Sequence, residues 1–460
     1  MSPFIIAGNR KNICCEVNFM NNEIFETMPV PKAYIKLALP VMMSSVLMLV
    51  YNMADTYFIA ATGNTDIVAA VSLCAPVFTF LIAIGDILGL GGSSYISRLL
   101  GSGRNDDARR ISVFCLCGSI VLGLVITLAL LLARTSVLKL LGADSNTAGF
   151  ASAYYTWIAA GASIIIFSLV PTNLLRTEGL ASRAMIGSML GSIVNIILDP
   201  VFISVLGMGA GGAAIATVIG NIFADIYYVY VIMNHSKCLS IDPRGFQIKA
   251  HESKEVLRIG IPSSVTNIMQ SIGVILLNNF LLPYGNERIA AMGIVSKITM
   301  IVIMIMVSFS FGGQPLYGYL YGADNRKRFR EVMRFAYMLV CGLGLAISCV
   351  LFAAAPLLVR LFIQEASFVQ LASSMLRTIL FGMPFIGFTM VTTCIFQSTG
   401  KASGALALSA GRQGYIYAVV LFILSALFGY TGVISAQPAA DAVSSLLALI
   451  LLKKLLKDWI

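Results

Sequence analysis

The stretch MIGSMLGSIVNIILDPVFISVL, residues 185–206, is long and apolar enough to cross a membrane, yet it contains Asp199. A second stretch of the same kind, PVMMSSVLMLVYNMADTYFIAA at 40–61, contains Asp55. An ionisable side chain near the bilayer centre costs roughly 2.5–3.5 kcal/mol on insertion scales. Neither stretch carries a Lys or Arg that would neutralise the charge. The two aspartates therefore predict a functional site inside the membrane, and we expect ion-coupled transport.

The composition is that of a chain that crosses the bilayer many times. Of its 460 residues 58% are hydrophobic and 11% charged, and the mean hydropathy is +0.88, whereas soluble chains carry about 25% charged residues. The net charge of +10 does not indicate a nucleic-acid partner, because the basic residues fall mostly in short loops on one side. HExxH, Walker A and Cys/His metal motifs are absent, so we expect neither enzyme activity nor a cofactor.

Twelve apolar stretches reach the length of about 20 residues that a membrane helix needs. They lie at 33–61, 67–97, 110–133, 150–175, 183–205, 212–233, 257–283, 289–319, 334–355, 370–397, 403–428 and 432–453. The polar connection 234–256 separates a first lobe, 32–233, from a second lobe, 257–460, and an N-terminal segment, 1–31, precedes both. The sequence thus predicts an all-α membrane protein with six helices in each lobe.

The two lobes are internal repeats. Gly91 and Gly312 lie 221 positions apart, as do Gly161 and Gly382. An even number of helices gives both lobes the same orientation, so we expect a pseudo-two-fold axis along the membrane normal and a cargo site between the lobes. We expect Met, aromatic and small residues to line that cleft, with acidic potential from the first lobe.

The basic residues indicate the orientation. One side of the predicted topology collects Arg98, Arg104, Arg109, Arg110, Lys237, Arg244, Lys249, Lys254, Arg258, Arg326, Lys327, Arg328, Arg330, Arg334, Lys453, Lys454 and Lys457. The positive-inside rule then places both termini and the connection in the cytoplasm. No cleavable signal peptide is visible, and residues 1–19 differ enough in character from the residues after them that a start at Met20 stays open.

The polar residues of the first lobe form a pattern that the repeat lacks. Asn195 and Asp199 are four apart and share a helix face, and Pro200 leaves a backbone carbonyl one turn earlier without its partner. Carboxylate, amide, hydroxyl and carbonyl oxygens suit a hard cation, and two neighbouring carboxylates also suit a proton. At the repeat spacing, Asp199 aligns with Val420. The acid is therefore not needed by the shared scaffold, which favours a functional role.

Four segments carry a resemblance to a known family. They are YNMADTYFIAATGN, SRLLGSGRNDDARR, LLRTEGLAS and NIILDPVFISVLGMGAGGAAIAT. The chain resembles the multidrug and toxic compound extrusion (MATE) family from about Glu23 onward, and AGRQG at 410–414 and AQPAAD at 436–441 are similar to its MepA-like, DinF-related bacterial branch. The resemblance implies a V-shaped pair of lobes, alternating access, and export of amphiphilic cations across the bacterial inner membrane in exchange for inward H⁺ or Na⁺. We also expect a monomer in the bilayer.

The resemblance also implies a set of site residues. The cation or proton site of related members falls here on Asp55, Asn195, Asp199, Thr217 and Asn173, and the first four of these would be the ligands of a Na⁺ ion. The chain departs from the NorM-like branch because Gln270 stands where that branch has a glutamate, and span ten lacks an acid. We therefore expect the first lobe to couple transport.

Other polar residues inside the spans are accessory candidates. They are Asp86, Gln270, Lys297, Arg412 and Asp441. Lys297 or Arg412 could pair with Asp441, and Arg412 could instead reach toward the cytoplasm. The same two basic residues leave open a flippase for lipid-linked oligosaccharides or peptidoglycan precursor, which would need a basic cavity. A membrane scaffold without transport activity would explain neither the buried acids nor the repeat.

Overall fold

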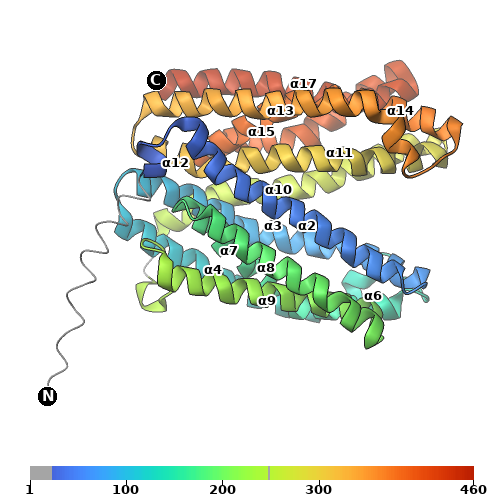
Figure 1. Cartoon of the computed structure of the whole chain (residues 1–460), viewed down its shortest axis with the longest axis horizontal. Helices are drawn as coiled ribbons and strands as arrows, with labels where there is room; N and C mark the ends of the chain where they lie inside the picture. The colour runs from blue at the N-terminus through green and yellow to red at the C-terminus, as the bar shows by residue number, and fades with distance from the viewer. Residues whose placement is uncertain (1–22, 247–248, 460) are drawn as a thin grey trace.

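The fold is described from a computed structural model, which covers residues 23–246 and 249–459; the alternative start at Met20 lies outside these residues. All the regular elements in this part of the chain are helices (Figure 1). The first lobe contains α2 (Val30–Ala60), α3 (Thr65–Gly101), α4 (Asn105–Leu132), α5 (Arg134–Leu140), α6 (Ala148–Ala160), α7 (Ala162–Thr177), α8 (Ala181–Asp199) and α9 (Gly209–His235). The second lobe contains α10 (Ala250–Leu281), α11 (Asn286–Gly312), α12 (Gln314–Gly322), α13 (Arg326–Arg360), α14 (Ala366–Leu380), α15 (Met383–Ser398), α16 (Ala402–Ala410) and α17 (Ile416–Trp459).

The helices account for the twelve predicted spans. Within the described residues, nine helices are long and apolar enough to cross a membrane, and two bent pairs, α6–α7 and α14–α15, bring the number to eleven. The twelfth span arises because the chain reverses direction within α17 at Gly429, whose φ is +58°. A Cβ on Gly432 would lie 1.9 Å from the carbonyl oxygen of Leu424, whereas residues eight apart in a straight helix are about 12 Å apart.

The predicted repeat is visible in the helix geometry. Span four bends by 51° between α6 and α7, at Gly161, and span ten bends by 42° between α14 and α15, next to Gly382. Each glycine lies against a neighbouring helix of its own lobe. A Cβ on Gly161 would lie 2.3 Å from Val218, and a Cβ on Gly382 would lie 3.1 Å from Pro438. Both lobes therefore use the same small residue at the same bend.

The connection between the lobes is shorter than predicted. The sequence predicts a polar connection over 234–256, but α9 continues to His235 and α10 begins at Ala250. The α10 start is stabilised by Glu252, whose carboxylate accepts the backbone N–H of Lys249 at 3.1 Å and pairs with Arg110 of α4. An acidic group in the first turn of a helix satisfies free N–H groups and favours the helix dipole, so the helix extends into the polar segment.

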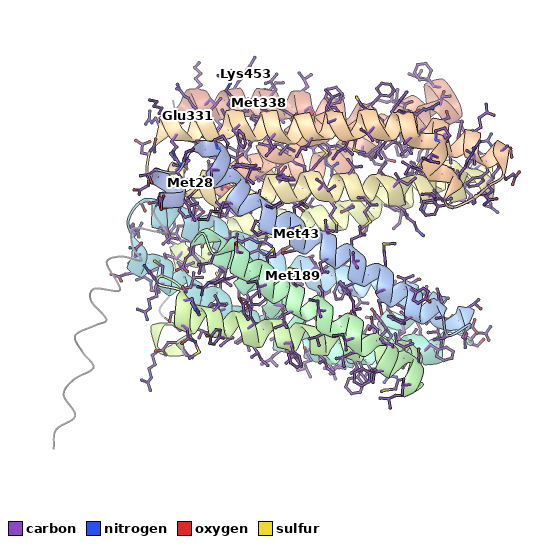
Figure 2. The ribbon with its side chains drawn as sticks, in the orientation of Figure 1. Met28, Met43, Met189, Glu331, Met338 and Lys453 are labelled. Carbon is purple, nitrogen blue, oxygen red and sulfur yellow. The ribbon has the colours of Figure 1, made fainter. Side chains whose placement is uncertain are left out.

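The two lobes meet at one end of the molecule, which we call the basic end. It contains Arg98, Arg110, Arg328 and Lys453, together with both ends of the described chain (Figures 1 and 2). There α3 of the first lobe packs on α10 and α12 of the second. Toward the opposite end, the ribbons of the two lobes separate (Figure 1).

Glycines bring the backbones of the two lobes into direct contact at the basic end. A Cβ on Gly101 of α3 would lie 1.9 Å from the carbonyl oxygen of Tyr319, and a Cβ on Gly260 of α10 would lie 1.9 Å from that of Ile87. An ion pair between Arg98 and Glu255, 3.6 Å apart, crosses the same contact. We call this contact, formed by α3 with α10 and α12, the interlobe seam.

The outer surface is largely apolar along the helices, as a lipid-facing surface requires. Leu132 is 80% exposed and Met338 is 64% exposed, and Figure 2 shows Met338 on the outer side of α13. Glu331 and Lys453, which are also labelled there, lie closer to the basic end. Charged groups thus mark the end of the apolar surface.

Candidate ion and substrate sites

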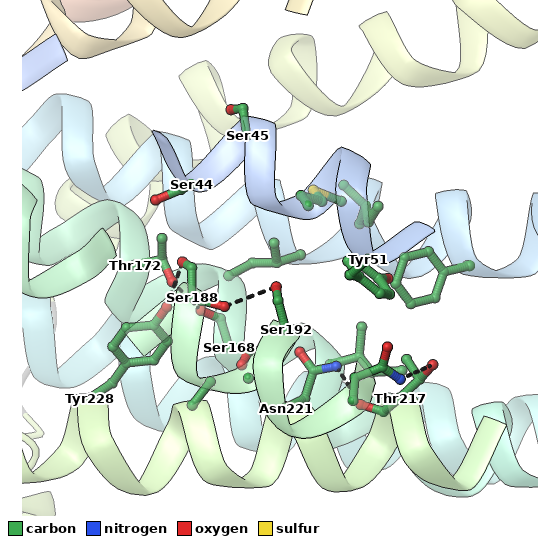
Figure 3. Close-up of a pocket in the computed structure, with 18 of the residues that line it drawn as sticks. Ser44, Ser45, Tyr51, Ser168, Thr172, Ser188, Ser192, Thr217, Asn221 and Tyr228 are labelled. Carbon is green, nitrogen blue, oxygen red and sulfur yellow. Dashed lines mark hydrogen bonds between the residues drawn. The ribbon is translucent and has the colours of Figure 1, made fainter. Parts of the chain in front are cut away.

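A polar cavity lies inside the first lobe (Figure 3). It has a volume of about 230 Å³ and is lined from α2, α3, α7, α8 and α9. Nine of its lining residues carry hydroxyl groups: Ser44, Ser45, Tyr51, Ser168, Thr172, Ser188, Ser192, Thr217 and Tyr228. We call it the first-lobe cavity.

Three of the predicted site residues meet at this cavity. The amide of Asn195 lies 3.4 Å from Oδ1 of Asp199 and 3.4 Å from Oγ1 of Thr217, so it bridges α8 and α9. Asn195 and Thr217 line the cavity, and Asp199 is fully buried beside them. Asp199 is the last residue of α8, which continues as a wider π-helical turn from Pro200 to Val205. A wider turn at this point is common at functional sites.

Asp55 approaches the same cluster from α2, which packs on α8. Its carboxylate and that of Asp199 interact electrostatically. The structure therefore brings Asn195, Asp199 and Thr217 together and places Asp55 on the helix that packs against α8.

Several oxygens of this cluster have no hydrogen-bond donor within the described part of the chain. They are Oδ1 of Asp55, Oδ1 of Asn195 and Oδ2 of Asp199, all buried. A buried oxygen without a partner costs roughly 1–3 kcal/mol. A proton or a small cation would relieve that cost, because both supply positive charge to acceptors that otherwise lack it.

Asn173, the fifth predicted residue, lies elsewhere. Its amide donates to the carbonyl of Leu169 at 2.9 Å, and its side chain lines a second cavity, between the lobes. This interlobe cavity has a volume of about 360 Å³ and is bounded by α2, α3 and α7 on one side and by α10, α11, α15 and α16 on the other.

The interlobe cavity is not the acidic cleft rich in Met and aromatic residues that the sequence predicts. Phe311 and Met390 are its only aromatic and Met residues among those described, and most other lining groups are polar. Its charged lining residues are Asp86, Arg176 and Arg412. The prediction fails because spans four and eleven each bring an arginine into the cavity.

Arg176 is a lining residue that the sequence pattern does not predict. It lies one residue beyond the predicted end of span four, where a basic side chain is expected to face water. Instead its guanidinium lines both cavities and lies 3.4 Å from the Asn173 side-chain oxygen. The only sequence signal for it is its place in LLRTEGLAS, a segment that carries the family resemblance.

The two cavities are related by the internal repeat. Residues of the first-lobe cavity and of the second-lobe wall of the interlobe cavity correspond at a spacing of 221 or 222: Ser44 and Thr266, Ser45 and Asn267, Met48 and Gln270, Ile82 and Ile303, Ser168 and Thr389, Thr172 and Thr393, Arg176 and Gln397, Ser188 and Ser409, and Gly191 and Arg412. Equivalent positions of the two bundles therefore line the two cavities.

The accessory candidates separate into three groups. Asp86 and Gln270 line the interlobe cavity. Arg412 pairs with Asp441 at 3.5 Å, and both side chains are buried, so Arg412 does not extend toward the cytoplasm. Lys297 is exposed and forms no ion pair in the part of the chain that the structure covers. Of the two partners that the sequence offers for Asp441, the structure therefore pairs it with Arg412.

This pair gives a prediction about stability. Replacing Asp441 with asparagine leaves the Arg412 guanidinium buried without a counter-charge, which should cost about 3–5 kcal/mol. We expect the purified Asp441→Asn variant to unfold at a clearly lower temperature than the parent protein. The double variant Arg412→Met/Asp441→Leu, which removes both charges, should recover most of the loss. Equal unfolding temperatures for Asp441→Asn and the parent would show that the pair contributes nothing to stability.

Comparison with known proteins agrees with the fold and the repeat. The MatE family model matches residues 40–201 and 262–431, one segment in each lobe. The multidrug export protein MepA of Staphylococcus aureus is 31% identical over 434 residues, which cover 94% of this chain and 96% of that protein. MepA of Staphylococcus saprophyticus is 28% identical over the same shares of the two chains.

Solved structures give the same result. A MATE protein in complex with MaD3S superposes with a TM-score of 0.90 at 28% identity, covering 95% of this chain and 98% of that one. An outward-facing multidrug resistance MATE transporter of the MOP superfamily superposes with a TM-score of 0.88, at the same identity and the same coverage of both chains. With two matched segments that together span most of both lobes, the chain belongs to the MatE family of transporters.

Proposed function

We propose that the protein exports amphiphilic, mostly cationic drugs or toxins across the bacterial plasma membrane, in exchange for inward H⁺ or Na⁺. The name of the 31%-identical S. aureus relative, a multidrug export protein, supports the cargo class. Export would proceed by alternating access of a monomer in the bilayer, with no nucleic-acid partner.

The observation that carries the coupling proposal is the cluster of Asp55, Asn195, Asp199 and Thr217. Three buried oxygens of this cluster have no hydrogen-bond donor in the described chain, and two of them belong to carboxylates. Such oxygens would bind a proton or Na⁺ when the cluster is open to water on one side. An antiporter needs an ion that favours one conformation and a cargo that favours the other. The first lobe supplies these ion-binding groups, whereas the repeat position of Asp199 in the second lobe is Val420.

The conformation supports a route to the outside. The interlobe seam closes the basic end, and the ribbons of the two lobes separate toward the opposite end (Figure 1). The solved structure on which this one superposes with a TM-score of 0.88 is described as outward-facing. We place the basic end in the cytoplasm because basic loops are retained on that side. The structure then represents the state from which cargo leaves the cell.

Drug resistance with controlled ion gradients tests this function. Expressed in a host that lacks its own efflux pumps, the protein should raise the inhibitory concentration of cationic dyes several-fold. In inside-out vesicles, the H⁺ and the Na⁺ gradients would be removed one at a time. Dye accumulation should stop when one of them is removed, and that gradient identifies the coupling ion. Uptake that ignores both gradients would contradict ion coupling, while the absence of any resistance would contradict drug export.

A further inference from the structure

A pocket lies between α13 and α14 of the second lobe, at the end of the molecule opposite the basic end (Figure 1). It has a volume of about 530 Å³ and contains two arginines, Arg360 from the last turn of α13 and Arg377 from the last turn of α14. No acidic residue of the described chain lines it. We call it the α13–α14 pocket, and its wall also includes Phe352, Gln370, Ser373, Ser374, Thr378 and Phe381.

Neither arginine is neutralised by a carboxylate of the protein. Arg360 forms no ion pair or hydrogen bond with any residue in 23–246 or 249–459. Nε of Arg377 donates to the backbone carbonyl of Phe352 at 3.2 Å, and its guanidinium lies 5.2 Å from the centre of the Phe352 ring. The terminal nitrogens of Arg377 have no acceptor among the described residues. Glu365, the acid nearest to Arg360 in the sequence, accepts a hydrogen bond from Ser367 instead, at 2.7 Å.

A buried hydroxyl belongs to the same pocket. Ser373 is 3% exposed and lines the pocket, yet its Oγ has no hydrogen-bond partner in the part of the structure described. Its repeat position in the first lobe is Ser152, whose Oγ accepts a hydrogen bond from Arg134. The repeat position of Arg134 is Ala355. The second lobe therefore contains the serine without the arginine that engages it, which leaves this hydroxyl for a ligand.

The surroundings of the pocket are those of a lipid headgroup. Arg377 falls inside the predicted span 370–397, where an arginine is costly unless it reaches water or a counter-charge. Leu361, next to Arg360, is 76% exposed, and Phe381, one turn after Arg377, is 67% exposed. The helix dipole favours a basic residue at the end of each helix, but it does not require both side chains to line one pocket. Two uncompensated positive charges beside an exposed apolar surface suit a ligand with an anionic head and apolar chains.

We propose that the α13–α14 pocket binds the phosphate group of an anionic lipid, which lies between Arg360 and Arg377. Guanidinium groups donate paired hydrogen bonds to phosphate oxygens, and the Ser373 hydroxyl supplies one more donor. The acyl chains would lie along Leu361 and Phe381. With the orientation proposed above, this lipid comes from the outer leaflet. Phosphatidylglycerol has the required chemistry, whereas the choline group of phosphatidylcholine would place a cation beside the two arginines. The inference does not depend on which cargo is exported.

Protection of a cysteine in the pocket wall tests the proposal. Ser374 is exposed and lines the pocket, so Ser374→Cys would be introduced into the full-length protein with its native cysteines replaced. The protein would be placed in nanodiscs of phosphatidylcholine alone, or of phosphatidylcholine and phosphatidylglycerol in equal amounts. An uncharged, membrane-impermeant maleimide should label the thiol about tenfold more slowly in the mixed nanodiscs, because a pocket that is about 90% filled leaves about a tenth of the thiols accessible.

Further variants show whether the protection comes from the pocket. Arg360→Gln and Arg377→Gln should each remove most of it, and Arg360→Gln should fold normally because Arg360 is exposed and has no partner in the described chain. Lys139→Gln is the matched control, since Lys139 is exposed and occupies the repeat position of Arg360 in the first lobe. It should keep the tenfold protection. Gln364→Cys, which is exposed outside the pocket wall, should react equally fast in both kinds of nanodisc.

Inorganic phosphate distinguishes the two sources of the ligand. Millimolar phosphate should not slow the labelling of Ser374→Cys in phosphatidylcholine nanodiscs, because free phosphate lacks the chains that hold a lipid at the pocket. Protection by inorganic phosphate as strong as that by phosphatidylglycerol would overturn the assignment to a lipid. Equal labelling of Ser374→Cys in the two kinds of nanodisc, or protection that survives both arginine variants, would overturn the site itself.

Discussion

Replacing Asp199 with asparagine should abolish ion-driven export and reduce resistance to that of cells without the transporter. Asp199 is fully buried, its Oδ2 has no partner in the described chain, and its other oxygen lies 3.4 Å from the Asn195 amide. Asparagine keeps the size of the side chain but can neither release a proton nor provide the negative charge that holds Na⁺. Without a bound ion, the two conformations lose the free-energy difference that drives exchange.

The folded protein should tolerate the change. No ion pair to Asp199 exists in the part of the chain described, so the substitution removes a buried charge without leaving an opposite charge behind. Transport would be measured as dye accumulation in inside-out vesicles, and folding as the unfolding temperature in detergent. Asp55→Asn should give the same loss, and Asn195→Ala a partial one. Parental transport rates in both aspartate variants would disprove this coupling site.

The sequence predicted the spans and the repeat well because both depend on local patterns. Apolar length sets the membrane helices, and the matched glycines Gly161 and Gly382 occupy matched bends. The Asn195–Asp199 pair was also predictable, since residues four apart share a helix face. These features require no knowledge of how distant helices pack.

The remaining features depend on packing between helices. Asn173 was predicted in the cation or proton site, but its amide packs against Gly89 of α3 and its side chain lines the interlobe cavity. Arg176 follows one turn later and lines both cavities. No pattern in one helix can predict which side of it faces another lobe. Lys297 and Arg412 illustrate the same limit, because one is exposed and the other buried in an ion pair.

Replacing Gly260 with alanine should open the basic end and strongly reduce export. The added Cβ would lie 1.9 Å from the carbonyl oxygen of Ile87 and 2.6 Å from its carbon, so one helix backbone must move. Overpacking of this kind costs about 1–3 kcal/mol, and only the conformation with a closed seam bears the cost. Since each 1.4 kcal/mol changes a population ratio tenfold, the closed state should fall about tenfold or more relative to the open one.

The matched control is Gly342→Ala in α13, where an added Cβ meets no atom within 4 Å. Alanine has a higher helix propensity than glycine by about 0.8–1.0 kcal/mol, so each substitution stabilises the helix that carries it. The two variants therefore differ only in whether the added methyl group meets the interlobe seam. A cysteine at position 97 (Ser97→Cys) would report whether the seam is open to water. Ser97 is 1% exposed and packs against Gly318, so its replacement can react with a reagent only when the seam opens. In a background without native cysteines, a membrane-impermeant maleimide applied to the basic side should label this thiol about tenfold faster with Gly260→Ala than with Gly342→Ala. Equal labelling rates, with equal export, would mean that closure of the seam does not control access to the cavity.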